Sequence, residues 1–169
     1  MSALAILAAG TSVVAAAEST LKVGDHAPKL QTGKWLQGDP VNEFEKGKAY
    51  IVEFWATWCG PCRSEVPALV TLHKQFQSRG VEIVGLSTEN PTASAESVRK
   101  FVDELKVDYP IGWASPELYA ALTQGTDRIP QSFIFARDGH VVKHFIGFGK
   151  INTPETIKAA LEEALNDKG

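Results

Sequence analysis

Two cysteines, the only ones in the chain, stand two residues apart in the segment Trp58-Cys59-Gly60-Pro61-Cys62. Paired thiols at this spacing serve either disulfide exchange or half of a metal site. A separation of three along a helix brings both sulfurs to one side, within disulfide reach. A purely structural disulfide is disfavoured, because so small a loop removes little entropy from the unfolded chain. We therefore interpret Cys59 and Cys62 as a redox-active disulfide pair.

The elements around the pair predict a different role for each sulfur. Residues 49–56 are β-branched, aromatic and almost continuously apolar, which predicts a strand covered on both faces. Pro61 then suits the first turn of a helix. Free N–H groups and the helix dipole at that start should stabilise a Cys59 thiolate and lower its pKa below the usual value of about 8.5. Cys59 should attack, the sheltered Cys62 should resolve, and Gly60 should keep the turn tight.

A metal site is the alternative reading of the two cysteines. Structural zinc needs four ligands at short spacing, and the four histidines (His26, His73, His140 and His144) are scattered along the chain. Copper(I) prefers soft ligands, and Met1 is the only methionine. We expect no metal and no bound cofactor. A copper-binding or haem-maturation module stays open as a rival from another class.

Length and composition point to one ordinary globular domain. The chain has 169 residues, 44% hydrophobic and 22% charged, with a formal net charge of -3. Such a length can bury a core without disulfide staples. No basic stripe is present, so we expect no nucleic-acid partner, and we expect a monomer.

The first seventeen residues differ from the rest. Met1–Ala17 carries no charged side chain, and the small residues before Glu18 fit a signal peptidase site. The segment is too short for a spanning helix, and the positive side chains usual at the start of a signal are missing. We expect a cleavable signal peptide at 1–17, with an N-terminal anchor or a wrongly assigned start codon as alternatives, and a domain at 18–169. Export would place that domain in the periplasm or another extracytoplasmic space, where disulfides persist.

Periodicity along the rest of the chain predicts alternating strands and helices. The lead-in at 18–47 is turn-rich, with short edge strands or a hairpin. A βαβ unit with parallel strands follows. Strands are expected at 49–56, 81–86, 109–111, 131–136 and 140–146, and helices at 61–80, 93–105, 116–122 and from 154 onward.

The segment Phe54-Trp55-Ala56-Thr57-Trp58-Cys59-Gly60-Pro61-Cys62 resembles the active site of the thioredoxin superfamily. Arg63-Ser64-Glu65-Val66-Pro67 is similar to its TlpA/ResA-like branch of bacterial extracytoplasmic thiol–disulfide oxidoreductases, and Val23–Pro28 to redoxin-type domains. The resemblance covers about Leu21 to Leu165. It implies a thioredoxin-like α/β/α sandwich with a mixed central sheet, an N-terminal extension and a central helical insertion.

The resemblance also implies roles for single positions. Cys59 and Cys62 match the redox pair, and Pro67 matches a proline that kinks the helix. Ile129-Pro130 matches a cis-proline dipeptide that faces the redox pair and pairs with the backbone of a bound substrate. Trp58 should shield the site and offer partners a flat apolar contact.

Two acids are candidates for proton transfer. Glu53 interrupts the apolar strand where thioredoxins keep a buried acid, and burial would raise its pKa so that it could take the Cys62 proton. The alternative is an ion pair with Lys48 or Lys143. Glu65 matches a glutamate at the active site of ResA-like proteins, and its alternative is a solvated acid in the first helical turn.

These features predict a protein disulfide oxidoreductase of the EC 1.8 type. Its substrates should be protein thiols and disulfides, and a redox partner, expected in the membrane, should regenerate the pair. Gly60-Pro61 resembles thioredoxin, near −270 mV, which favours a reductant. The alternative is a redoxin-type thiol peroxidase, although Ala56 stands where those enzymes keep a threonine.

Overall fold

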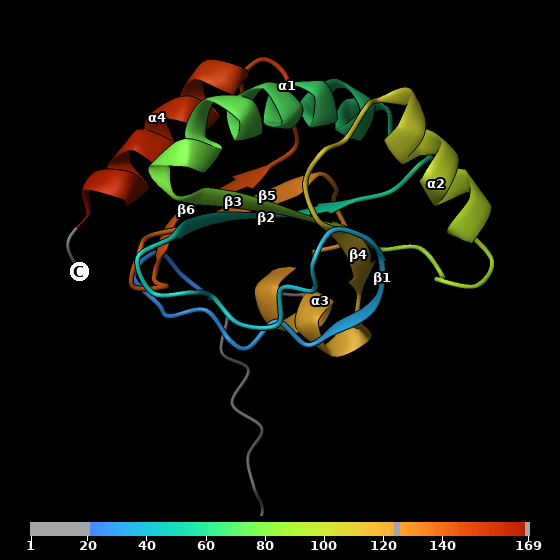
Figure 1. Cartoon of the computed structure of the whole chain (residues 1–169), viewed down its shortest axis with the longest axis horizontal. Coiled ribbons are helices and arrows are strands. Elements are labelled where there is room, and N and C mark those ends of the chain that lie inside the picture. Colours follow the sequence, from blue (N-terminus) through green and yellow to red (C-terminus); the bar gives the residue numbers. More distant parts are fainter. Residues whose placement is uncertain (1–20, 124–125, 168–169) are drawn as a thin grey trace, which may run out of the picture.

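A six-stranded sheet forms the centre of the computed structural model, which describes residues 21–123 and 126–167 (Figure 1). The expected signal segment lies outside these residues. The strand order is β1-β4-β3-β2-β5-β6. Strand β3 pairs in parallel with β2 and β4, and the other three pairings are antiparallel, so the sheet is mixed. The strands are β1 Thr32–Gln37, β2 Ala49–Trp55, β3 Val81–Ser87, β4 Ile111–Ala114, β5 Gln131–Phe135 and β6 Val141–Ile146.

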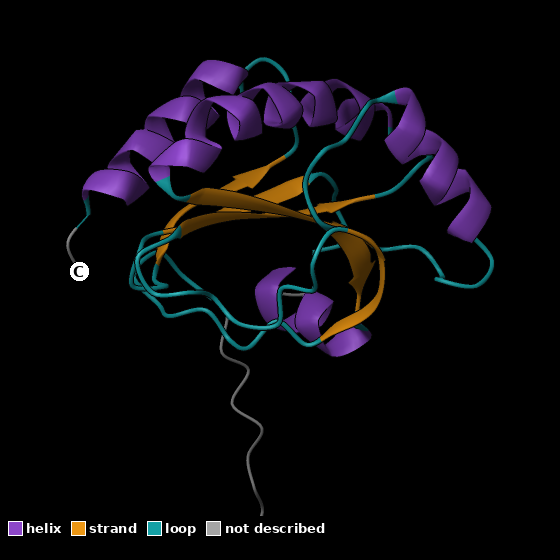
Figure 2. Ribbon diagram, in the orientation of Figure 1, coloured by secondary structure: helices purple, strands orange, loops and turns teal. Residues whose placement is uncertain are grey.

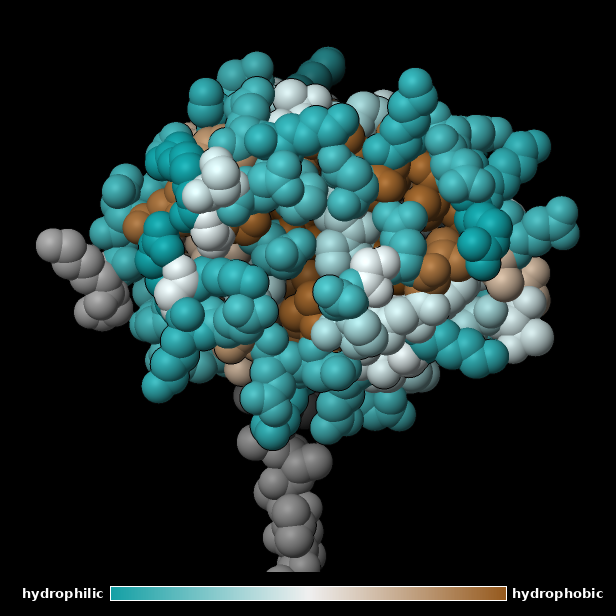
Figure 3. Space-filling view, viewed as in Figure 1, coloured by the Kyte–Doolittle hydropathy of each residue, from teal (hydrophilic) through white to brown (hydrophobic). Residues whose placement is uncertain are grey.

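Helices cover both faces of this sheet, as the α/β/α expectation requires (Figure 2). Helices α1, α4 and α2 lie over one face, and α3 with the lead-in segment lies over the other (Figure 1). The helices are α1 Gly60–Phe76, α2 Ala95–Glu104, α3 Pro116–Thr123 and α4 Pro154–Asn166, with a 3₁₀ turn η1 at Gln77–Arg79. The outer surface of the helical layer is mainly hydrophilic, with apolar side chains between the helices (Figure 3).

Strand β2 is buried along its whole length because it separates two apolar cores. Ile51 and Trp55 belong to the core under α1, whereas Val52 and Phe54 belong to the core over α3. This alternation follows from the two-residue period of a strand. Burial of each such side chain contributes about 1.5–3 kcal/mol, so both layers stabilise the strand that leads into the cysteines.

Helix α1 begins and ends at the positions that local signals predict. Cys59 is its N-cap, and Pro61 and Pro67 lie in its first turn and interior. After Phe76 the chain tightens into η1 and leaves through Gly80, whose φ of 86° suits a residue without a Cβ. Thr153 caps α4 with a capping box, and Pro154 opens that helix, as predicted.

The predicted elements differ from the structure mainly near β4. The predicted strand at 109–111 is shifted, because β4 starts only after Pro110, which has no N–H to donate to a ladder. The lead-in forms one edge strand, β1, which fits the first of the two predicted alternatives, and it pairs with β4 instead of folding into a hairpin. Gly112 permits this approach, since a Cβ there would lie 3.1 Å from the Trp35 ring. The central insertion therefore contains a strand as well as helices.

No helix within residues 21–123 and 126–167 is long and apolar enough to cross a membrane.

Candidate active site

Cys59 and Cys62 form a disulfide at the junction of β2 and α1. Their sulfurs are 2.07 Å apart and their Cα atoms 5.3 Å apart. Cys59 is 4% exposed and Cys62 is fully buried. The structure thus gives the two sulfurs the unequal access that the sequence predicted for an attacking and a resolving cysteine.

The start of α1 directs backbone N–H groups at Cys59. The Cys62 N–H donates to Cys59 Sγ at 3.2 Å, and the Arg63 N–H donates to the Cys59 carbonyl oxygen at 3.2 Å. A Cys59 thiolate would therefore meet a backbone donor and the positive end of the helix dipole. Cys62 lies one turn further along α1 and is therefore not at the helix start.

A carboxylate that sequence reasoning missed holds the loop before Cys59. Glu89 accepts hydrogen bonds from the Thr57 N–H at 2.7 Å and from Thr57 Oγ1 at 2.8 Å. Charge-assisted bonds to both groups of one residue fix its backbone strongly. The position of Glu89 in the sequence could have indicated this role. Glu89 follows β3, whose last residue Ser87 is the parallel partner of Trp55, so both strands end at the same edge of the sheet.

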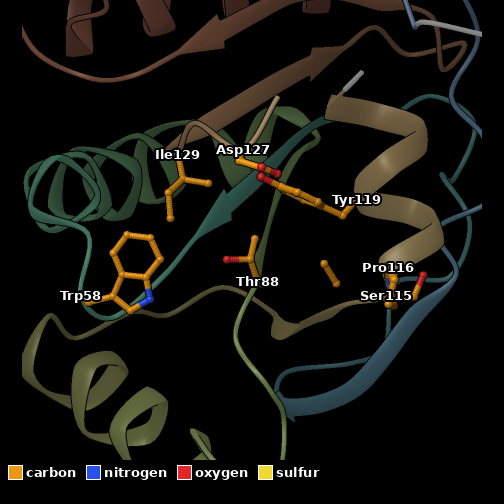
Figure 4. Close-up of a pocket in the computed structure, with 8 residues that line it drawn as sticks. Trp58, Thr88, Ser115, Pro116, Tyr119, Asp127 and Ile129 are labelled. Atoms are coloured by element: carbon orange, nitrogen blue, oxygen red, sulfur yellow. The ribbon is translucent and has the colours of Figure 1, made fainter. Parts of the chain in front are cut away.

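The Ile129–Pro130 peptide bond is cis, as the resemblance implied. Gln131 pairs with Phe54 in the β2–β5 ladder, which brings Pro130 to the end of the sheet that carries the cysteines. The Trp58 side chain is 72% exposed beside Cys59. Trp58 and Ile129 border a cavity of about 420 Å³, shown in Figure 4.

Glu53 is fully buried, on the face of β2 that α1 covers. Tyr109 Oη donates to Glu53 Oε2 at 3.4 Å, and Oε1 has no hydrogen-bond partner in the described structure. Burial, and then the charge of Glu65, raise the pKa of Glu53 well above its usual value. The ion-pair alternative is wrong: Lys48 pairs with Glu45 at 3.0 Å, and Tyr109 is the only partner of the Glu53 carboxyl among the described residues.

Glu65 is also buried, with 1% of its surface exposed. The alternative of a solvated acid is therefore wrong, because Glu65 lies three residues after Cys62 and shares its inward face of α1. Ser132 Oγ donates to Glu65 Oε1 at 2.8 Å, and Oε2 has no partner in the described structure. Burial raises the pKa of Glu65 to about 7, although the Ser132 bond opposes this.

The two acids belong to one polar cluster within an apolar core. Ser132 is the antiparallel ladder partner of Glu53 and the hydrogen-bond donor to Glu65. Tyr109 reaches Glu53 from the segment before β4. Sequence reasoning found both carboxyls but missed Tyr109 and Ser132. A serine on the buried face of a strand was the available signal for the latter.

Metal ligands do not gather in this part of the chain. Within the described ranges, no group of three or more His, Cys, Asp or Glu side chains could hold a metal ion.

A comparison with known protein families identifies the family of this chain. The AhpC/TSA family matches residues 23–144, which is most of the chain and includes both cysteines. The chain belongs to the AhpC/TSA family.

Two curated relatives are similar to this AhpC/TSA protein, and the name of the second states an activity. FixW of Rhizobium leguminosarum is 33% identical over 141 residues, which cover 76% of this chain and 62% of FixW. The thiol-disulfide oxidoreductase ResA of Bacillus thuringiensis (strain Al Hakam) is 30% identical over 128 residues, which cover 70% of this chain and 72% of that protein.

Solved structures agree with these relatives. A thiol:disulfide interchange protein of the thioredoxin family from Chlorobium tepidum TLS has 32% identity and a TM-score of 0.70, covering 86% of this chain and 99% of its own. StoA from Bacillus subtilis has 29% identity and a TM-score of 0.57, covering 69% and 84%. This AhpC/TSA protein is a thiol–disulfide oxidoreductase with a thioredoxin-like fold, as predicted.

Proposed function

We propose that this protein reduces disulfides in other proteins, with Cys59 as the nucleophile and Cys62 as the resolving thiol. The observation that carries the proposal is the Cys62 N–H directed at Cys59 Sγ at 3.2 Å, at the start of a helix. A backbone donor in this place favours negative charge on the sulfur that attacks. The complete burial of Cys62 supports an intramolecular role for that residue.

The reaction proceeds in two exchanges. The Cys59 thiolate attacks one substrate sulfur, a Cys59–substrate disulfide forms, and the other substrate sulfur leaves as a thiolate that takes up a proton. Cys62 then loses its proton, and its thiolate attacks Cys59 Sγ. The second substrate sulfur leaves, the protein dithiol becomes the disulfide, and the substrate gains two electrons and two protons.

Glu53 is proposed to take the proton from Cys62. It lies on the face of β2 under α1, between Ile51 and Trp55 of the core that contains Cys62. Burial raises its pKa, so the ionised form of its carboxyl is a strong enough base to take a proton from a thiol. Glu65 lies one helical turn beyond Cys62 and shares this environment. The carboxyl pair therefore supplies a proton acceptor to a thiol that water does not reach.

We also propose that the protein works as a reductant outside the cytosol. Gly60-Pro61 between the cysteines supports the reducing direction, and the apolar stretch Met1–Ala17 supports export. A dithiol partner, expected in the membrane, would return the electrons. The reduction potential of the Cys59–Cys62 pair tests the direction: a value near −270 mV supports it, and one near −120 mV reverses it.

Variants of the two cysteines test the proposed roles. Cys59→Ser should abolish reduction of insulin disulfides, whereas Cys62→Ser should accumulate a Cys59-linked mixed disulfide that mass spectrometry detects. If Cys59→Ser reduces insulin disulfides at the wild-type rate, the proposed mechanism is wrong. Peroxide consumption by the same preparations separates this activity from a redoxin-type peroxidase, which would consume peroxide through Cys59 alone.

A further inference from the structure

A cavity of about 420 Å³ is lined by Trp58, the residue before Cys59, and by Ile129 of the cis peptide bond. Cys59 is only 4% exposed, so a substrate disulfide must contact the residues that surround Cys59 in order to reach its sulfur. Trp58 and Ile129 stand at one side of the cavity, and Pro116 at the start of α3 stands at the other (Figure 4). This space therefore lies within reach of side chains that flank a substrate cysteine bound at Cys59.

The lining of the cavity carries a single charge. Asp127 is its only charged residue, and Asp127 is exposed. Among the residues that the structure describes, no Lys, Arg or His forms a salt bridge with it. Arg128 follows in the chain but does not line the cavity. The carboxylate is thus available to a cation from outside.

Of the three hydroxyls that line the cavity, Tyr119 and Thr88 can only accept from a ligand, whereas Ser115 Oγ accepts from the Leu118 N–H and keeps its own proton. Tyr119 Oη donates to the Thr126 carbonyl oxygen at 3.2 Å, and Thr88 Oγ1 donates to the Trp55 carbonyl oxygen at 3.4 Å. Each of these two hydroxyls already donates its one proton within the protein, so it can only accept a hydrogen bond from a ligand in the cavity. The hydroxyl end of Tyr119 is directed toward Asp127 in Figure 4. This corner therefore suits a ligand that is rich in N–H donors.

We propose that the cavity binds a lysine or arginine side chain that flanks the reactive cysteine of the substrate protein. The inference rests on the proposed function and specifies its substrates. The alkyl stem lies against Trp58 and Ile129, and the cationic end reaches Asp127.

Synthetic disulfide-linked peptides test this preference. Each of the two positions on either side of the cysteine carries lysine, norleucine or glutamate in turn, and the reduced protein is mixed with each peptide. At the best position, the lysine peptide should react about fivefold faster than the norleucine peptide, as expected for one exposed ion pair. High salt should shrink this ratio, because it screens exposed charges. Equal rates for all three side chains at every position would overturn the proposal.

Asp127 variants tie the preference to the cavity. Asp127→Asn should lower the lysine peptide rate to that of the norleucine peptide and leave the latter unchanged, and Asp127→Lys should favour glutamate. Asp103→Asn, with the same charge change at an exposed position of α2 outside the cavity, should keep the wild-type ratio. A lysine preference that survives in Asp127→Asn would overturn the assignment.

Insulin reduction is measured in parallel. If the wild type does not reduce insulin, the proposed function is refuted. If it reduces insulin normally but shows no charge preference among the peptides, only this subsite is refuted.

Discussion

The hydroxyl of Ser132 donates a 2.8 Å hydrogen bond to Oε1 of Glu65, which ties α1 to the strand beside Glu53. Glu53 and Ser132 face each other in the β2–β5 ladder, so the two carboxyls share one buried site. Like charges in such a site ionise with difficulty together. The Glu53–Glu65 pair therefore keeps a proton more readily than either acid would alone, and its titration belongs to the pair.

Replacement of Glu65 by glutamine should stabilise the protein at alkaline pH. Burial raises the pKa of Glu65 from 4.5 to about 7, so ionisation costs free energy only in the folded state. The contribution of Glu65 to the free energy of unfolding should fall by up to about 3 kcal/mol as the pH rises from 4.5 through 7. Glu65→Gln should lack this loss. Urea unfolding of the oxidised proteins between pH 4.5 and 8 measures the difference, and parallel pH curves would contradict it.

Replacement of Glu53 by glutamine should slow resolution of the mixed disulfide. Without a carboxylate at this position, the Cys62 proton has a poorer acceptor, and we expect at least about a tenfold slower second exchange at neutral pH. Stopped-flow mixing of the reduced protein with a peptide disulfide separates the two exchanges. The first exchange should keep its rate.

An exposed glutamate provides the control for this experiment. Glu163→Gln on α4 changes the net charge equally and should leave both exchanges unaltered. Glu53→Gln and Glu65→Gln combined should slow the second exchange by less than the product of their single effects, since groups in one network do not act additively. A second exchange that keeps its wild-type rate in Glu53→Gln would remove Glu53 from the mechanism.

Glu89 should matter for the first exchange, although it does not touch the sulfurs. Glu89→Gln leaves one acceptor oxygen for Thr57, so one charge-assisted bond becomes neutral and the other is lost or reversed, with Nε2 donating to Thr57 Oγ1. A charge-assisted bond is worth about 1.5–3 kcal/mol, against about 1 kcal/mol for a neutral bond. The loop that carries Trp58 should loosen, and alkylation of reduced Cys59 by iodoacetamide should change its pH profile. Glu96→Gln on α2 is the matched control. If both variants share the wild-type pH profile, Glu89 acts on stability alone.

The parts of the site that local patterns predict are those built by neighbours in the chain, whereas the cis peptide bond at Ile129-Pro130 was predicted from the family resemblance. The strand, the capped helix start and the order of Cys59 and Cys62 follow from local patterns between Ala49 and Pro67. The burial of Glu65 does not, because its partner Ser132 is 67 residues away. Tyr109 lies 56 residues from Glu53, and no period in the sequence links them. Tertiary packing alone brings these groups together.

Gly85 decides whether Tyr109 can reach Glu53. Gly85 is the parallel ladder partner of Glu53, and a Cβ at this position would lie 2.6 Å from Ile111 Cδ1 and 3.2 Å from Tyr109 Cε2. Gly85→Ala should therefore displace both side chains and cost about 1–3 kcal/mol of unfolding free energy, as overpacking of a core does. Gly33→Ala in β1, where a Cβ would lie 3.4 Å from the Trp113 carbonyl oxygen, is the control for the loss of a glycine. Thermal unfolding measures stability, and the rate of the second exchange reports on the Tyr109–Glu53 contact.

A second variant separates this contact from packing. Because Tyr109→Phe removes the hydrogen bond to Glu53 without overpacking, it should change the rate of the second exchange in the same direction as Gly85→Ala. Opposite changes would show that Gly85 serves packing only.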